Sequence, residues 1–145
     1  MPVSSLHHQR QAKSKEEHKP RILIVDDDAD ITTSFRLGLQ QYGFQVDTSN
    51  NPLLVASSYN AGSYDLLLLD IRMPLMDGFT LYKEIRKIDN DVRVCFITAY
   101  EINSEDFQKS FPTMALRHFI KKPIGLEVLA KELNRKLKED FEIIG

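Results

Sequence analysis

The sequence predicts an α/β fold in which one open, parallel sheet of five strands carries helices on both faces. Short apolar runs alternate along the chain with stretches whose apolar residues recur at the 3.6-residue spacing of a helix. One apolar run consists of four leucines, which is too short for a buried helix and fits a strand covered on both faces. Alternating strands and helices give a parallel sheet, because right-handed crossovers return every strand to the same direction.

The first half of the chain contains two strand–helix pairs. The strands are predicted at 22–25 and 44–48, from β-branched and alternating apolar residues. The first helix, 31–42, ends before a glycine, and the second, 52–61, follows Asn51, a residue suited to an N-cap. The predicted buried face of the first helix consists of Ile31, Phe35, Leu39 and Tyr42.

The second half contains three more pairs, with strands predicted at 66–69, 92–97 and 116–121. A helix follows the Asp-Gly turn at 77–78, a short one is predicted at 103–111, and a long one ends the chain. The buried positions predicted for the first and last of these helices are Leu81, Ile85 and Ile88, and Leu126, Leu129, Leu133 and Leu137.

The length of 145 residues suits one domain, predicted at 21–140. Residues 1–20 are polar without periodicity and are expected to form a flexible tail, while 141–145 would be a remnant or the start of a linker.

The net charge of −2 includes no basic block, so nothing points to direct nucleic-acid binding. No apolar run exceeds four residues, so no membrane span is expected and the cytoplasm is the default location. Cys95, the only cysteine, lies in an apolar strand and is expected in the core.

Polar side chains follow four of the five predicted strands, at the point where each strand ends. Asp26 and Asp27 follow the first strand, Asp70 the third, Thr98 the fourth and Lys122 the fifth. The second strand contributes none, so we place it at an edge, which gives the order 2-1-3-4-5. Ligands bind outside the carboxyl ends of strands in such sheets. We therefore expect these five side chains to line one cleft.

The expected cleft holds three carboxylates, which repel one another unless a cation lies between them. Mg²⁺ suits such a site, because it prefers carboxylate oxygens and keeps several waters that a phosphoryl group can replace. Lys122 adds a positive charge and Thr98 a hydroxyl donor. Together these are the parts needed to move a phosphoryl group onto a carboxylate such as Asp70.

Each of these residues also has an ordinary structural explanation. Aspartate is common where strands end, so Asp70 alone could be a turn residue. Acidic residues at 26–28 suit the N-terminus of a helix through its dipole. Thr98 could simply end a strand, and Lys122 could be an exposed lysine. The functional interpretation depends on their convergence.

Five motifs at characteristic spacing resemble the response-regulator receiver domain of two-component signalling, the family of the chemotaxis protein CheY. They are Ile-Leu-Ile-Val-Asp26-Asp27-Asp28, Asp65-Leu-Leu-Leu-Leu-Asp70-Ile-Arg-Met-Pro74, Met76-Asp77-Gly78, Ile97-Thr98-Ala99 and Phe119-Ile-Lys-Lys122-Pro123. The resemblance covers 21 to about 139 and implies the flavodoxin-like, doubly wound (βα)5 fold. It also implies a phosphorylation-activated switch that promotes its own phosphorylation and dephosphorylation, and not a conventional enzyme.

The resemblance implies a role for each residue of the cleft. Asp70 would be the phosphoacceptor, which takes its phosphoryl group from a phosphohistidine of a sensor histidine kinase or phosphotransfer protein. Asp27, Asp70 and the backbone carbonyl of Arg72 would bind Mg²⁺, and Asp26 would do so through water or by orienting a ligand. Lys122 would pair with the aspartate and then with the phosphoryl group.

The resemblance further implies a switch in which Thr98 moves toward the phosphoryl group and Phe119 rotates inward. Simple core packing of Phe119 remains an open alternative, since the two interpretations differ only in whether its ring has two rotamers. Pro123 would follow a cis peptide bond. Arg72 and Tyr100 occupy the variable positions that flank the acceptor and would set the lifetime of the phosphoryl group. A downstream effector protein or domain would receive the signal.

Two other functions use similar residues. A phosphatase of the haloacid dehalogenase type also has a strand-end Asp nucleophile, a Thr, a Lys and Mg²⁺, but here Asp26-x-Asp28 lacks the Gly-Thr that would follow it. A pseudo-receiver that binds partners without phosphorylation usually lacks one of the key residues, and none is missing. The sequence names neither the kinase nor the effector, and leaves open whether the chain acts alone or within a longer regulator.

Overall fold

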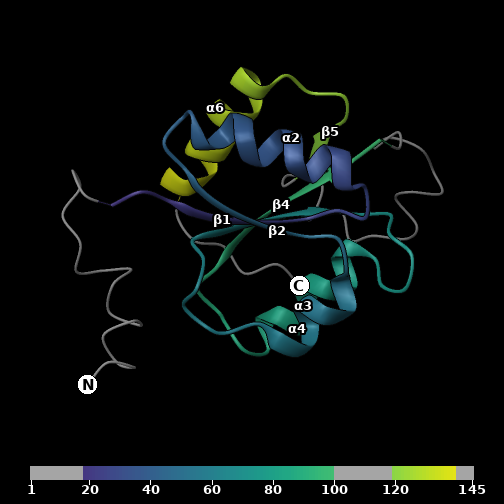
Figure 1. Ribbon diagram of the computed structural model, residues 1–145. Coiled ribbons are helices and arrows are strands. Elements are labelled where there is room, and N and C mark those ends of the chain that lie inside the picture. The colour runs from purple at the N-terminus through teal and green to yellow at the C-terminus, as the bar shows by residue number, and fades with distance from the viewer. Residues whose placement is uncertain (1–17, 100–118, 140–145) are drawn as a thin grey trace.

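The computed structural model describes residues 18–99 and 119–139, and its centre is a five-stranded parallel sheet (Figure 1). The strands are β1 (Arg21–Val25), β2 (Gln45–Ser49), β3 (Leu66–Asp70), β4 (Arg93–Thr98) and β5 (Phe119–Lys121). Their order is β2-β1-β3-β4-β5, with β2 at an edge. The predicted fold class and strand order are therefore confirmed.

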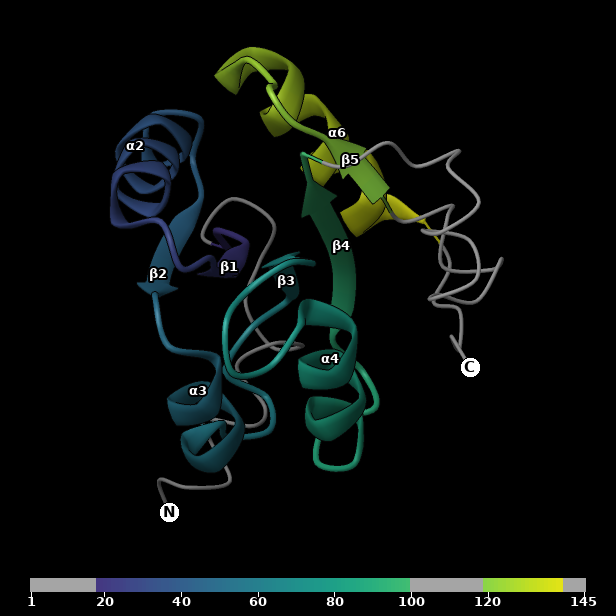
Figure 2. The same cartoon turned by 90° about the vertical axis from the view of Figure 1, so that its right-hand side faces the viewer.

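Helices cover both faces of this sheet (Figures 1 and 2). The helices in the described ranges are α2 (Ala29–Gln40), α3 (Pro52–Ser58), α4 (Gly78–Arg86) and α6 (Leu126–Lys138). α2 and α6 lie on one face, and α3 and α4 on the other. The predicted helix 103–111 and the first residues of the predicted fifth strand lie outside the described residues. None of the helices described here is long and apolar enough to cross a membrane.

The four consecutive leucines of β3 explain how the core is divided. Leu66 and Leu68 join the apolar cluster under α2 and α6, whereas Leu67 and Leu69 join the cluster under α3 and α4. All four are fully buried, as a strand covered on both faces requires. Cys95 belongs to the first cluster, as predicted, and its burial raises the pKa of the thiol to about 12.

Side-chain caps begin three of the helices. Asn51 caps α3 as predicted, because its side-chain oxygen accepts hydrogen bonds from the N–H groups of Leu53 and Leu54. Asp28 caps α2 and Asp77 caps α4 in the same way. Asp28 therefore has the structural role of a helix-capping residue.

One predicted helix end and two predicted buried positions are wrong. The second predicted helix, α3, ends at Ser58 and not near 61. Tyr42 and Ile88 were predicted to be buried, but they are 50% and 49% exposed. Both residues follow the ends of their helices, where the 3.6-residue spacing no longer determines which way a side chain faces.

Gly38 has a packing role within α2. A Cβ atom at this position would collide with the side chain of Leu126 in α6. Glycine lowers the stability of a helix, but at this position it allows α2 and α6 to approach closely on the same face of the sheet.

Candidate functional site

The predicted site residues follow the carboxyl ends of neighbouring strands. Asp26 follows the last residue of β1, Asp70 is the last residue of β3, and Lys122 follows β5. The parallel register pairs Val25 of β1 with Leu69 of β3, so the next residue of each strand is an aspartate. The pairing of β1 with β3, inferred from strand order, thus brings together acidic residues that are distant in the sequence.

Asp26, Asp27 and Asp70 form one acidic cluster. Each offers a carboxylate oxygen, and these three atoms lie within 4.8 Å of one another. Asp26 and Asp70 are 1% and 5% exposed, whereas Asp27 is exposed to solvent. Two buried carboxylates and one accessible carboxylate fit a hard cation such as Mg²⁺, which takes few protein ligands and retains water.

Lys122 joins two of these carboxylates. Its Nζ lies 2.8 Å from Asp26 Oδ2, to which it donates a hydrogen bond, and 3.6 Å from Asp70 Oδ1. Its backbone N–H donates to the carbonyl of Thr98, which ties it to the end of β4, and the Lys122–Pro123 peptide bond is cis. The structure therefore places the lysine ammonium against the acidic cluster, closer to Asp26 than to Asp70.

The electrostatic environment raises the pKa of Asp70 to about 6. Burial is the main cause, and the negative charge of Asp26 adds to it, while Lys122 opposes the rise. Burial lowers the pKa of Lys122, but the hydrogen bond to Asp26 and the charge of Asp70 outweigh it and leave that pKa raised. The lysine is thus positively charged at neutral pH, and the surroundings of Asp70 disfavour its ionised form.

The structure describes three of the four residues predicted to switch the domain or to set the phosphoryl lifetime. Thr98 is the last residue of β4 and is fully buried, next to Ile97, which pairs with Asp70 in the sheet. The ring of Phe119, at the start of β5, is partly buried and lies 5.5 Å from the ring of Phe96, centroid to centroid. Arg72 is exposed just beyond β3. Tyr100 lies outside the described residues.

Asn50 is a residue of the site that the sequence did not reveal. Its Nδ2 donates to the backbone carbonyl of Asp26 at 2.8 Å and to Thr32 Oγ1 in α2 at 3.1 Å. It therefore fixes the turn between β1 and α2 that carries Asp26 and Asp27. The available signal was the Asn-Asn pair after the second strand, of which only Asn51 was interpreted, as an N-cap.

We expect Asn50→Ala to lower the free energy of unfolding by about 1 kcal/mol, the usual contribution of a hydrogen-bonded polar group. The released turn should also weaken Mg²⁺ binding by several fold, as measured by isothermal titration calorimetry. Asn134→Ala, an exposed position on α6, is the matched control and should change neither quantity appreciably. Unaltered Mg²⁺ affinity in Asn50→Ala would show that the turn holds its shape without this side chain.

The start of α4 packs directly against the end of β3. The N–H of Gly78 donates to the carbonyl of Ile71 at 3.0 Å. A Cβ atom at Gly78 would collide with the backbone carbonyl of Asp70. Only glycine therefore allows the first turn of α4 to pack against the loop that follows Asp70.

Gly78→Ala is expected to destabilise the fold by about 1–3 kcal/mol, because the added methyl group must displace backbone and not a mobile side chain. Chemical denaturation would measure this loss. Thr80→Ala, an exposed change in the same helical turn, should have little effect. Equal stabilities of the two variants would show that β3 and α4 separate at no cost.

The chain resembles known receiver domains in sequence. A model of the response regulator receiver domain family matches residues 22–134. The transcriptional regulatory protein CpxR homolog of Haemophilus influenzae is 36% identical over 125 residues, which is 86% of this chain and 47% of that protein. Transcriptional regulatory protein PrrA of Mycobacterium tuberculosis is 40% identical over 80 residues, or 55% of this chain and 34% of PrrA. The chain thus spans about a third to a half of the length of these relatives.

Solved structures agree with this comparison. The response regulator protein TrrA from Thermotoga maritima, in complex with Mg²⁺-BeF, superposes with a TM-score of 0.65 at 31% identity, covering 81% of this chain and 98% of that one. The non-phosphorylated HemR receiver domain from Leptospira biflexa gives a TM-score of 0.71 at 27% identity, covering 87% and 100%. With most of the chain matched in both sequence and fold, this protein belongs to the response regulator receiver domain family.

Proposed function

We propose that the protein is a phosphorylation-activated switch of a two-component system, with Asp70 as the phosphoacceptor. The observation that supports this most strongly is the contact of Lys122 Nζ with Asp26 and Asp70, inside a cluster of three carboxylates. The donor would be a phosphohistidine on a sensor histidine kinase or phosphotransfer protein. The relatives described above are transcriptional regulators, so we propose an effector protein or domain as the recipient of the signal.

Mg²⁺ is the cofactor that the donor set fits. We propose that Asp27, Asp70 and the backbone carbonyl of Arg72 hold it, with Asp26 acting through water. The carboxylates lie close enough to share one ion, and the exposure of Asp27 keeps one of them in contact with solvent. TrrA, solved with Mg²⁺-BeF, supports this choice. When bound, the ion offsets the negative charge that the phosphoryl group brings into an acidic cleft.

The proposed transfer has a simple chemical balance. A carboxylate oxygen of Asp70 forms a bond to phosphorus while the phosphorus–nitrogen bond of the donor breaks, and the imidazole leaves with the electron pair. Lys122 contributes positive charge toward the phosphoryl oxygens, and Thr98 contributes a hydroxyl donor. Burial of Asp70 removes competing water from the attacking carboxylate.

The signal would leave the site through Thr98 and Phe119. Phe119 packs on Phe96, a fully buried residue of the cluster under α3 and α4, so a rotation of its ring would change the packing of that cluster. Arg72, exposed beside the acceptor, and Tyr100 would regulate the access of water and hence the lifetime of the phosphoryl group.

Incubation with acetyl phosphate and Mg²⁺, followed by intact-mass spectrometry, tests the proposal. One phosphoryl adduct is expected, it should map to the peptide that contains Asp70, and chelation of Mg²⁺ should prevent it. No adduct, or an adduct elsewhere, would contradict the assignment. Repeated turnover of p-nitrophenyl phosphate would instead support a phosphatase of the haloacid dehalogenase type.

A further inference from the structure

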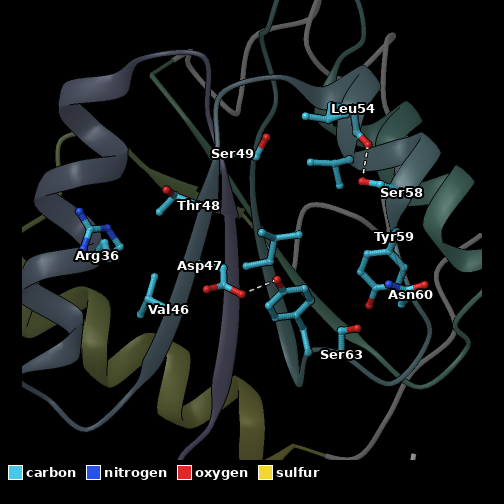
Figure 3. Close-up of a pocket in the computed structure, with 13 residues that line it drawn as sticks. Arg36, Val46, Asp47, Thr48, Ser49, Leu54, Ser58, Tyr59, Asn60 and Ser63 are labelled. Atoms are coloured by element: carbon cyan, nitrogen blue, oxygen red, sulfur yellow. Dashed lines mark hydrogen bonds between the residues drawn. The ribbon is translucent and has the colours of Figure 1, made fainter. Parts of the chain in front are cut away.

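A groove of about 540 Å³ lies along the free edge of β2 (Figure 3). α2, which carries Arg36, borders it on one side, and α3, which carries Leu54 and Ser58, borders it on the other. β2 lies between them and contributes Val46, Asp47, Thr48 and Ser49 to the lining. None of the acidic-cluster residues or Lys122 lines this groove, so it is separate from the phosphorylation site.

The backbone of β2 presents hydrogen-bonding groups to this groove. The backbone N–H of Gln45 donates to the carbonyl of Pro20, just before β1, and the carbonyl of Ser49 accepts from the N–H of Asp26, just after β1. In a parallel pair only every second residue bonds to a given neighbour, so Gln45, Asp47 and Ser49 face β1. The N–H and C=O groups of Val46 and Thr48 therefore point to the opposite edge. Within the described ranges, no hydrogen bond reaches these groups and no strand pairs with this edge. Such an edge is a template for an added strand.

The charged groups of the groove differ in their partners. Asp47 accepts a hydrogen bond from the hydroxyl of Tyr64 at 2.6 Å, on the α3 side of β2. Arg36, on the α2 side, has no hydrogen bond or ion pair with any residue in the described parts of the chain. The positive charge of Arg36 is thus available to an acidic group that enters the groove.

We propose that this groove binds an extended segment of a partner protein, which adds as a strand to β2 and places an acidic side chain against Arg36. The five residues of β2 span about 17 Å, so a segment of about five residues would fill the edge. The backbone groups of Val46 and Thr48 would supply affinity, and Arg36 would select the sequence. Alternate side chains of the segment would face α2 and α3.

A second copy of this chain is a less suitable occupant. An antiparallel pairing of two β2 strands over all five residues would set the two Asp47 carboxylates opposite each other. Like charges directly opposite across a strand pair are destabilising. A partner with an acidic residue on the α2 side avoids this repulsion and satisfies Arg36.

The test uses a phage-displayed library of random heptapeptides, selected on the full chain. Selected peptides are expected to carry Asp or Glu at a shared position. Amide hydrogen exchange by NMR should show that the bound peptide slows exchange of Val46 and Thr48 by about tenfold or more, with little change at Gln45, Asp47 and Ser49. Failure to enrich any peptide, or protection elsewhere on the surface, would overturn the proposal.

Charge reversal provides the matching specificity test. Arg36→Glu should weaken the binding of the selected acidic peptide by about tenfold. A peptide with Lys at the shared position should bind this variant with restored affinity. Lys131→Glu makes the same charge change on α6, outside the groove, and should bind as the wild type does. If Arg36→Glu binds the acidic peptide as tightly as the wild type does, Arg36 does not select the peptide sequence. Protection of Val46 and Thr48 that rises with protein concentration alone would identify a second copy as the occupant and contradict the proposal.

Discussion

Asp70→Asn is expected to abolish phosphoryl labelling and, at the same time, to stabilise the metal-free protein. The first effect follows from the loss of the attacking carboxylate, because an amide at this position is not a nucleophile toward phosphorus. The second follows from the pKa of Asp70, which is raised to about 6 by burial and by Asp26. A variant that loses function but gains stability is difficult to explain by misfolding.

The sign of the stability effect follows from proton linkage. The unfolded chain loses the Asp70 proton near its usual pKa of 3.8, whereas the folded protein retains it until about pH 6. Between these values the folded state binds more protons, so the contribution of Asp70 to the free energy of unfolding falls as pH rises. Above pH 6 the ionised carboxylate costs the metal-free protein about 1–3 kcal/mol, and Asp70→Asn should recover that amount.

Urea denaturation with EDTA at pH 7.5 and at pH 4 would measure this difference. The free energy of unfolding of the variant should exceed that of the wild type at pH 7.5, and the two values should converge at pH 4. Adding Mg²⁺ should stabilise the wild type more than the variant, because a ligand of the folded state alone raises its stability. Asp91→Asn, an exposed change, is the control. If Asp70→Asn were less stable than the wild type at pH 7.5 in EDTA, burial and Asp26 would not govern the ionisation of Asp70.

The fold and much of the site could be predicted because a few strong signals decide them. Four adjacent leucines require a strand that is covered on both faces, and that requirement places β3 at the centre of the sheet. Polar residues after four strands, but not after the second, then indicate which strand is at the edge. The strand order predicts that Asp27 lies next to Asp70, without any statement about side-chain conformation, and the two belong to one cluster with Asp26.

The remaining features depend on contacts that no pattern encodes. Lys122 pairs with Asp70 as expected, but it makes a shorter contact with Asp26, since side-chain positions at the ends of strands depend on three-dimensional packing. Asn50 lies in a loop, where polar residues are common and its two hydrogen bonds leave no trace in the sequence. The groove beside β2 arises from the separation of α2 and α3, which periodicity alone does not determine.

Lys122→Met is expected to reduce phosphoryl transfer to Asp70 by about 100-fold or more while metal binding persists. The ammonium group supplies positive charge where the phosphoryl oxygens would lie, and loss of one such group typically costs this much. Its removal also leaves Asp26, only 1% exposed, beside Asp70 without a cation. We expect the free energy of unfolding of the metal-free protein to fall by about 2–4 kcal/mol. This is less than for a fully buried pair, because 17% of the lysine side chain is exposed.

Mg²⁺ binding separates the role of Lys122 in transfer from a general loss of structure. Without the lysine, the three carboxylates attract a cation more strongly, so calorimetry should show Mg²⁺ affinity that is unchanged or higher. Mg²⁺ should also restore most of the lost stability, because it replaces the missing positive charge. Lys122→Arg keeps the charge but not the compact ammonium geometry, and should retain stability better than it retains transfer. Weaker Mg²⁺ binding in Lys122→Met would mean that the lysine organises the carboxylates, and its proposed contribution to transfer would then fail.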